Sequence, residues 1–287
     1  MAVRTPEPTV AGLPAAAAPS RTRSARFPAD LDLWVPGVLF GLIALACFLL
    51  PMIPSLPGPN DGSLSEALQP LFSPGHVLGT DPLGNDILSR LLHGGQTSLI
   101  VGFCTNVAGI VIGGFIGILA GFKGGLIDAT IMRVLDVFMA FPALVLAIVV
   151  ATYLGPSLPN LVGTLTIVTV PMYARIARAT TLKQREHVYI SAARVAGQRD
   201  LAILFRHIAP NAAAPVLTAS LLAFGVVIVV EATLSFLGLG IPPPDPTWGN
   251  MIARGQSNLS TDPALVLIPR SCPQSHIRRV ARSIMAW

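Results

Sequence analysis

Residues 189–211 read YISAARVAGQRDLAILFRHIAPN, a short basic segment punctuated by alanine and glycine. The segment is caught between two long apolar runs, at about 161–174 and 212–239, which we interpret as membrane spans. Cytoplasmic loops of membrane proteins are enriched in lysine and arginine. We therefore predict a cytoplasmic loop at about 175–211, on the evidence of its cations: Arg175, Arg178, Lys183, Arg185, Arg194, Arg199 and Arg206.

The composition agrees with a membrane protein. Of the 287 residues, 52% are hydrophobic and only 11% are charged, whereas a soluble domain carries about 25% charged residues. The 19 Lys and Arg against 14 Asp and Glu could indicate nucleic-acid binding, but these cations lie between and beside the apolar runs. The three cysteines, Cys47, Cys104 and Cys272, lack metal-ligand spacing and imply no disulfide framework.

The apolar runs predict an all-α polytopic protein with five clear spans, at about 34–53, 99–122, 131–153, 161–174 and 212–239. Residues 1–33 lack apolar periodicity and are predicted to be a disordered tail. Arginines precede the first run, so the N-terminus is expected to be cytoplasmic. The stretch that follows the first span, to about residue 96, is expected outside the membrane.

The C-terminal part departs from this pattern. Residues 264–268 begin like a sixth span and stop after five apolar residues. A charged side chain at the bilayer centre costs about 2.5–3.5 kcal/mol, so the prolines and arginines that follow do not continue a span. We predict a transmembrane domain at 34–268 and an atypical basic tail at 269–287, whose abrupt change of composition suggests a reading-frame shift.

The loop sequence resembles the EAA loop of ABC-importer permeases, which in that family docks onto a separate ATPase subunit. Small side chains suit the close seating of a short helix, and Gly197 can adopt the positive φ that ends it. Ser191 stands where the family usually has glutamate and is expected to cap a helix start. The alternative is an ordinary basic loop. The resemblance implies ATPase contacts by Ser191, Ala192, Ala193, Arg194, Gly197, Asp200, Arg206, His207 and Pro210.

Residues 79–90, GTDPLGNDILSR, resemble the GTDxxGRDxxSR signature of the C-type permease subunits for dipeptides, oligopeptides and nickel, with Asn85 in place of arginine. Asp81 followed by Pro82 predicts the start of an amphipathic surface helix that ends at Gly94 and Gly95. Four residues separate Asp86 from Arg90, which predicts an ion pair on one face of that helix. The signature residues are Gly79, Thr80, Asp81, Asp86 and Arg90.

Two further segments match the same subfamily. Residues 231–240, EATLSFLGLG, followed by WGNM at 248–251, resemble its EAxLSFLGLG and WGxM segments. A carboxylate in an apolar helix either lines a pathway or bonds a neighbouring helix, and for Glu231 the second role is favoured. Residues 132–142 resemble the MRxxDxxxAxP segment, in which Arg133 and Asp136 are expected to pair and Pro142 to kink the third span.

Together the motifs resemble the C-type permease of a peptide/nickel-class ABC importer, which implies the type I importer transmembrane fold. The resemblance implies uptake of di- or oligopeptides across the bacterial cytoplasmic membrane. It also implies a second permease subunit, two ATPase subunits that bind ATP and Mg, and an extracytoplasmic substrate-binding protein.

No phosphate-binding loop, HExxH, CxxC or GxSxG motif occurs, so no catalytic, cofactor or metal residue is expected in this chain. Nickel or other non-peptide import, and an inactive truncated or scaffold subunit, remain alternatives. An intramembrane enzyme is disfavoured because the spans carry no paired catalytic groups.

Overall fold

The computed structural model describes residues 29–54 and 56–261, and these ranges contain helices and isolated β-bridges but no β-strand. Most of the predicted tail at 1–33 and all of the tail at 269–287 lie outside them. The part of α1 up to Leu42 belongs to a separate unit from the rest of the chain. The elements are α1 (Ala29–Leu49), η1 (Leu50–Met52), η2 (Leu64–Glu66), α2 (Ile87–Lys123), α3 (Gly125–Met139), α4 (Ala143–Leu154), α5 (Leu158–Arg185), α6 (Val188–Val195), α7 (Asp200–Ile203), the π-helical turn η3 (Leu204–Ile208), α8 (Ala209–Phe236) and α9 (Trp248–Thr261).

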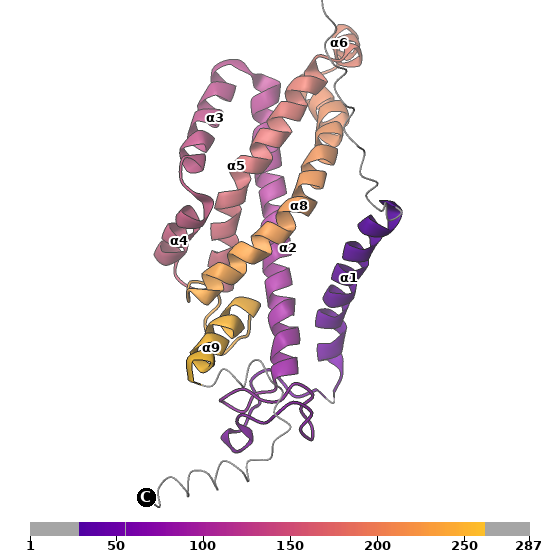
Figure 1. Ribbon diagram of the computed structural model, residues 1–287. Coiled ribbons are helices and arrows are strands. Elements are labelled where there is room, and N and C mark those ends of the chain that lie inside the picture. The colour runs from indigo at the N-terminus through magenta and orange to yellow at the C-terminus, as the bar shows by residue number, and fades with distance from the viewer. Residues whose placement is uncertain (1–28, 55, 262–287) are drawn as a thin grey trace, which may run out of the picture. The chain divides into compact units, whose positions relative to one another are not determined.

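Helix α2 is the centre of the larger unit, and α5 and α8 pack along it (Figure 1). The α2 face toward α5 carries glycines at four-residue spacing: Gly109, Gly113, Gly117 and Gly121. A Cβ atom at Gly117 would lie 2.1 Å from the carbonyl oxygen of Ala174 on α5. Because small residues let transmembrane helices approach closely, this stripe places the two backbones in direct contact.

Two buried polar side chains of the bundle form hydrogen bonds between helices. Tyr173 of α5 is fully buried, and its hydroxyl donates a hydrogen bond to Oδ1 of Asn106 on α2. The Asn106 amide nitrogen in turn donates to the carbonyl oxygen of Ser220 on α8, at 3.4 Å. This chain of bonds ties together the three main helices, α2, α5 and α8.

Three helices of the described residues are long and apolar enough to cross a membrane, over Val35–Met52, Ile87–Lys123 and Asp200–Phe236. A fourth candidate is the pair α3 and α4, which is bent by 88° at the break that contains Pro142. The predicted kink at Pro142 is therefore confirmed. The structure is an all-α membrane protein with three or four candidate spans, and the count of five spans with a sixth disrupted stays a prediction.

Two predicted helix limits are wrong. The Asp81 carboxylate accepts hydrogen bonds from the backbone N–H groups of Leu83 and Asn85, each at 2.9 Å, so it closes a turn and no helix starts there. Helix α2 starts instead at Ile87, where the side chain of Asp86 accepts from Ser89 N at 2.7 Å. Gly94 and Gly95 do not end a helix but lie inside α2, where they give α9 room to pack.

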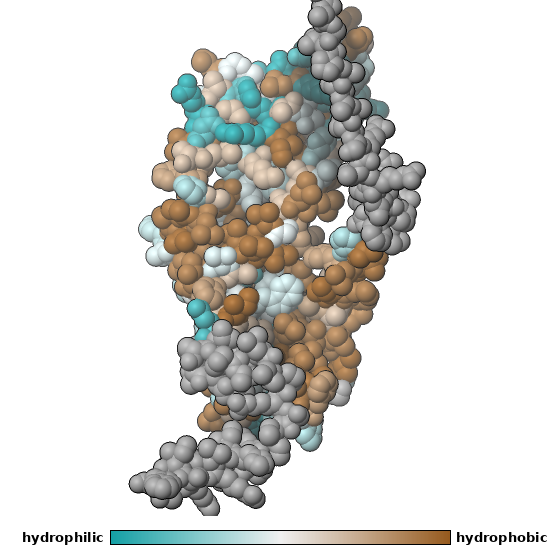
Figure 2. Space-filling view, viewed as in Figure 1, coloured by the Kyte–Doolittle hydropathy of each residue, from teal (hydrophilic) through white to brown (hydrophobic). Residues whose placement is uncertain are grey.

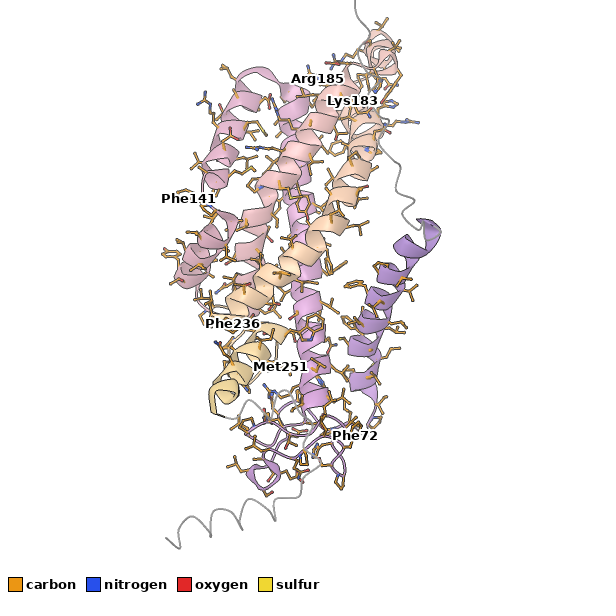
Figure 3. All side chains as sticks on the ribbon, in the orientation of Figure 1. Phe72, Phe141, Lys183, Arg185, Phe236 and Met251 are labelled. Carbon is orange, nitrogen blue, oxygen red and sulfur yellow. The ribbon has the colours of Figure 1, made fainter. Side chains whose placement is uncertain are left out.

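The surface is hydrophilic at one end of the helices and hydrophobic along their middle. Figure 2 shows hydrophilic residues gathered at the end near the α2–α3 turn and hydrophobic residues along the middle of the helices. Figure 3 shows Lys183 and Arg185 at that end of α5, close to α6, and Phe141 at the α3–α4 break. The segment at 56–86, which includes Phe72, lies at the opposite end of α2.

Candidate functional site

The segment between α5 and α8, residues 186–208, is here called the helical loop. Its first helix, α6, ends at Val195 and is followed by Ala196 and by Gly197, whose φ is +77°. The N–H groups of Gly197 and Gln198 donate to the carbonyl oxygens of Arg194 and Ala193, at 3.0 and 3.1 Å. These bonds close the helix end that a glycine with positive φ permits, as predicted. The predicted cap at Ser191 is wrong, because α6 already starts at Val188 and Ser191 lies within it.

The inner face of the helical loop is apolar and anchored to α2. Phe122, in the last turn of α2, packs with Ile190 and Ala193 of α6 and with Ile203, Leu204 and Ile208 of the following turns. Of these loop residues, only Ala193 was singled out from the sequence. Because well-packed apolar groups move together, a force applied to the helical loop reaches the end of α2 directly.

The outer face of the helical loop is exposed and mixes apolar with basic side chains. Val195 is 91% exposed and Phe205 62% exposed. Other exposed residues of this face include Val188, Ser191, Ala192, Arg194, Gly197, Arg199, Asp200, Leu201 and Arg206. His207 is partly buried, with its ring 6.2 Å from that of Tyr189, and Pro210 is exposed in the first turn of α8. The exposed valines and phenylalanine were not predicted, since their only signal is an apolar residue within a basic loop.

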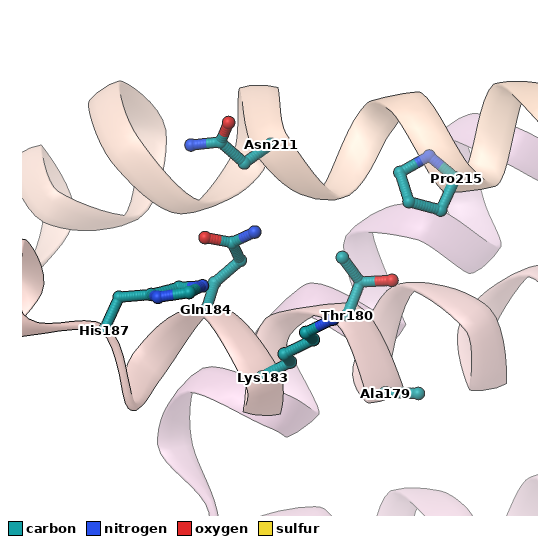
Figure 4. Close-up of a pocket in the computed structure, with 7 residues that line it drawn as sticks. All are labelled: Ala179, Thr180, Lys183, Gln184, His187, Asn211 and Pro215. Atoms are coloured by element: carbon teal, nitrogen blue, oxygen red, sulfur yellow. The ribbon is translucent and has the colours of Figure 1, made fainter.

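A cleft of about 480 Å³, lined by both polar and apolar groups, opens between α5 and α8, beside the helical loop (Figure 4). Its α5 side carries Lys183 and Gln184, and Asn211 faces them from α8. The remaining lining residues are Ala179, Thr180, His187 and Pro215. The cleft has room for solvent or a small solute.

Helix α3 is joined to α5 by two ion pairs. Asp128 accepts from Nε and Nη2 of Arg178, at 2.5 and 2.7 Å, so this pair is bidentate. Asp136 accepts from Nη2 of Arg175 at 2.6 Å. The predicted pairing of Asp136 with Arg133 is wrong, because the α5 cation reaches the carboxylate instead and the described residues show no bridge between Asp136 and Arg133.

Glu231 lies inside the bundle, on the face of α8 that meets its neighbours. It is fully buried, and its Oε1 accepts a hydrogen bond from Ser235 Oγ at 2.7 Å. Within this chain the carboxyl group is thus held by its own helix and lies away from the exposed surface. The predicted bond from Glu231 to a neighbouring helix is not borne out by this contact and stays a prediction.

The signature residues at 79–90 tie the 56–86 segment to both α2 and the α8–α9 connection. Arg90 is buried, and its Nη1 donates to Pro59 O and to Asn60 Oδ1, each at 2.9 Å. Its Nη2 donates to Pro244 O at 3.2 Å. The predicted pair with Asp86 is wrong, since Asp86 caps α2 and binds His76 Nδ1 at 2.8 Å, while Arg90 Nε lies 3.7 Å from Asp81.

The other two signature residues, Thr80 and Gly79, contact the backbone of the same segment. Thr80 Oγ1 accepts from Gln69 N at 2.8 Å and donates to Glu66 O. Gly79 has a φ of +76°, and a Cβ there would lie 2.3 Å from Gln69 O. The motif thus specifies how this segment folds onto the end of α2.

We expect Arg90→Lys to loosen the 56–86 segment. A lysine cannot reproduce the planar fork that reaches three acceptors, and a lost hydrogen bond to a charged group costs about 1.5–3 kcal/mol. The rate of proteinase K cleavage within 56–86, measured on the detergent-solubilised protein, should rise. Leu64→Ala, which truncates an exposed side chain in the same segment, is the control. Equal cleavage rates in Arg90→Lys and the unaltered chain would contradict this structural role.

The sequence comparisons agree on one family. The family model described as "binding-protein-dependent transport system inner membrane component" matches residues 113–269. A putative peptide transport system permease protein of Brucella suis biovar 1 (strain 1330) is 43% identical over 221 residues, which are 76% of this chain and 73% of the relative.

Two further relatives extend the comparison. The dipeptide transport system permease protein DppC of Haemophilus influenzae is 34% identical over 242 residues, or 81% of this chain and 82% of the relative. The glutathione transport system permease protein GsiD of Pectobacterium atrosepticum is 40% identical over 197 residues, or 69% of this chain and 65% of the relative.

Proposed function

Because this chain belongs to the family of binding-protein-dependent transport system inner membrane components, we propose that it is a membrane-spanning permease subunit of an ATP-driven peptide importer. Peptide or dipeptide permeases are prominent among its relatives, which supports di- or oligopeptides as the substrate class. The glutathione permease among them also carries a small peptide by its printed name. A nickel importer finds no comparable support.

The main support for the proposal is that the helical loop has a buried apolar face and an exposed face of mixed apolar and basic side chains. Its inner face is packed against Phe122 at the end of α2, while Val195 and Phe205 are exposed on its outer face. An exposed apolar patch on a protein surface marks a site for a partner. We propose that this face docks onto a cytoplasmic ATPase subunit, with Arg194, Arg199 and Arg206 available to partner carboxylates.

In this proposal the remaining parts of the importer are separate chains. A second permease completes the membrane pathway, two ATPase subunits bind ATP and Mg, and a substrate-binding protein delivers peptides on the outer side. The helical loop and the N-terminus face the cytoplasm of a bacterium, and the 56–86 segment faces outward. The motion of the docked loop is passed to α2 through their shared apolar packing, and this biases the bundle between inward and outward openings.

Reconstitution of the complete complex tests the proposal. The chain, its companion permease, the ATPases and the binding protein are placed in liposomes, and uptake of a radiolabelled dipeptide is measured with and without internal ATP. ATP-dependent accumulation, together with peptide-stimulated ATP hydrolysis, is the expected result. Uptake of Ni²⁺ without peptide uptake, or hydrolysis indifferent to the loaded binding protein, would contradict it.

A further inference from the structure

The α3 helix carries two exposed faces of opposite character. One face presents Ile127, Val134 and Phe138. The other presents Ala129, Arg133, Asp136 and Ala140, whose spacing of three or four residues places them in one stripe along the helix. Hydrocarbon can cover the first face. The second face contains charged side chains, which lipid acyl chains do not solvate.

The ion pair on this stripe is exposed and is bordered by apolar surface. The side chains of Asp136 and Arg175 are 53% and 48% exposed, although they bind each other at 2.6 Å. Val134 and Val137 on α3 and Met172 on α5 are exposed around them. Asp136 lies eight residues beyond Asp128, or about 12 Å further along α3 from the helical-loop end.

The same stripe continues on α5 toward the cleft beside the helical loop. Arg175, Ala179 and Lys183 follow one another at four-residue spacing and are all exposed. Ala179 and Lys183 also line the cleft between α5 and α8. Two exposed cations, with Ala179 between them, thus mark this face of α5 from the Asp136–Arg175 pair to the helical-loop end. Charged residues within membrane spans typically face a water-filled cavity or pair within the protein.

We propose that this stripe borders the water-filled route of the importer and that Asp136 and Arg175 bind the two termini of the passing peptide. The inference rests on the proposed function, since it takes a peptide as the substrate. The Arg175 guanidinium can bind a terminal carboxylate through two parallel hydrogen bonds, and Asp136 can accept from a terminal ammonium group. The termini of an extended dipeptide lie about 7 Å apart, so the ion pair opens when the peptide binds.

Charge balance supports a substrate with both termini free. The Asp136–Arg175 pair itself carries no net charge. A zwitterionic peptide that separates the pair gives each of the two side chains a new ionic partner, whereas a peptide with a blocked amino or carboxyl end leaves one of them without a partner. The lost ion pair is then not replaced, so the site discriminates against blocked peptides.

The first test measures water access without requiring transport. In a chain whose native cysteines are replaced by serine, Asp136→Cys is compared with Val137→Cys, the next residue, which is 62% exposed on the apolar side. A charged methanethiosulfonate reagent is applied to both faces of membranes that contain the assembled complex. Asp136→Cys should react about tenfold faster or more, because the reactive thiolate forms in water. Equal rates would overturn the water-filled route.

The second test measures selectivity in the reconstituted complex. The uptake ratio of a free dipeptide to its N-acetylated form is determined for the unaltered chain and for the double variant Asp136→Asn, Arg175→Gln, with the same binding protein. The ratio should fall about fivefold or more in the double variant. It should stay unchanged in Asp128→Asn, which removes the other α3–α5 ion pair. A ratio unchanged in the double variant would overturn peptide-end binding. Absence of peptide uptake by the unaltered chain would count against the proposed function instead, while the labelling result would still decide the route.

Discussion

Replacement of Gly197 with aspartate is expected to reduce ATP-driven peptide uptake about tenfold or more, while the protein still inserts and folds. The structure indicates why uptake should be lost while folding is kept. A Cβ atom at Gly197 meets no other atom within 4 Å, so the substitution causes no collision inside this chain. The φ of +77° is one that aspartate tolerates better than most residues. The substitution should therefore impair the contact between this exposed surface and the ATPase proposed to dock there.

The electrostatic change acts in the same direction. Arg194 and Arg199 flank Gly197 on the exposed face, and a carboxylate between them offers an intramolecular partner to cations proposed to bind the ATPase. The measurements are uptake into liposomes and the rate of ATP hydrolysis by the same preparation. Loss of uptake with hydrolysis retained indicates uncoupling, and loss of both indicates failed docking. Either result supports the proposed role of the helical loop.

Gly238→Asp is the matched control for this experiment. Gly238 also has a positive φ, of +79°, and a Cβ there also meets nothing within 4 Å. It is exposed just beyond α8, at the other end of α8 from the helical loop, and its N–H and that of Leu239 close the helix end as those of Gly197 and Gln198 do. Uptake by Gly238→Asp should stay within about twofold of the unaltered chain, as is usual for exposed substitutions. Equal losses in both variants would show that backbone strain, rather than ATPase docking, explains the result.

Local sequence signals predicted the parts of the fold that depend on neighbouring residues. The helix end at Gly197 and the break at Pro142 follow from the backbone preferences of glycine and proline, which act wherever these residues stand. The family could likewise be predicted, because its motifs occur in this sequence in the expected order. The apolar runs predicted an all-α membrane protein, because the length and hydropathy of a span are also properties of contiguous residues.

The two mistaken ion pairs share one physical cause, which is competition from distant residues. Asp136 had a suitable partner one turn away in Arg133, but Arg175, from a different helix, reaches it at 2.6 Å. Likewise Arg90 was expected to pair with Asp86, whereas carbonyl groups of Pro59 and Pro244 take its guanidinium. Spacing along a helix shows which pairs are possible. It cannot show which tertiary partner lies closer.

Replacement of Gly117 with leucine is expected to abolish the folded bundle. A Cβ at this position would lie 2.1 Å from Ala174 O and 2.8 Å from the Cβ of Ala177, so both the backbone and a side chain of α5 oppose it. Even Gly117→Ala forces α2 and α5 apart, and overpacking of this kind costs about 1–3 kcal/mol. A leucine side chain adds three further carbons to the same collision, with no flexible neighbour that could yield.

Gly114 provides the control within the same helix. It lies three residues before Gly117, and a Cβ there meets no atom within 4 Å. Thermal unfolding of the detergent-solubilised protein is monitored by size-exclusion chromatography after heating. Gly117→Leu should show no folded peak, and Gly117→Ala should show a lowered unfolding midpoint. Gly114→Ala should match the unaltered chain. If Gly117→Ala and Gly114→Ala unfolded at the same temperature, the glycine stripe would not be what holds α2 against α5. Loss at Gly117 alone would show that close backbone contact positions α5, and with it the helical loop that follows at its end.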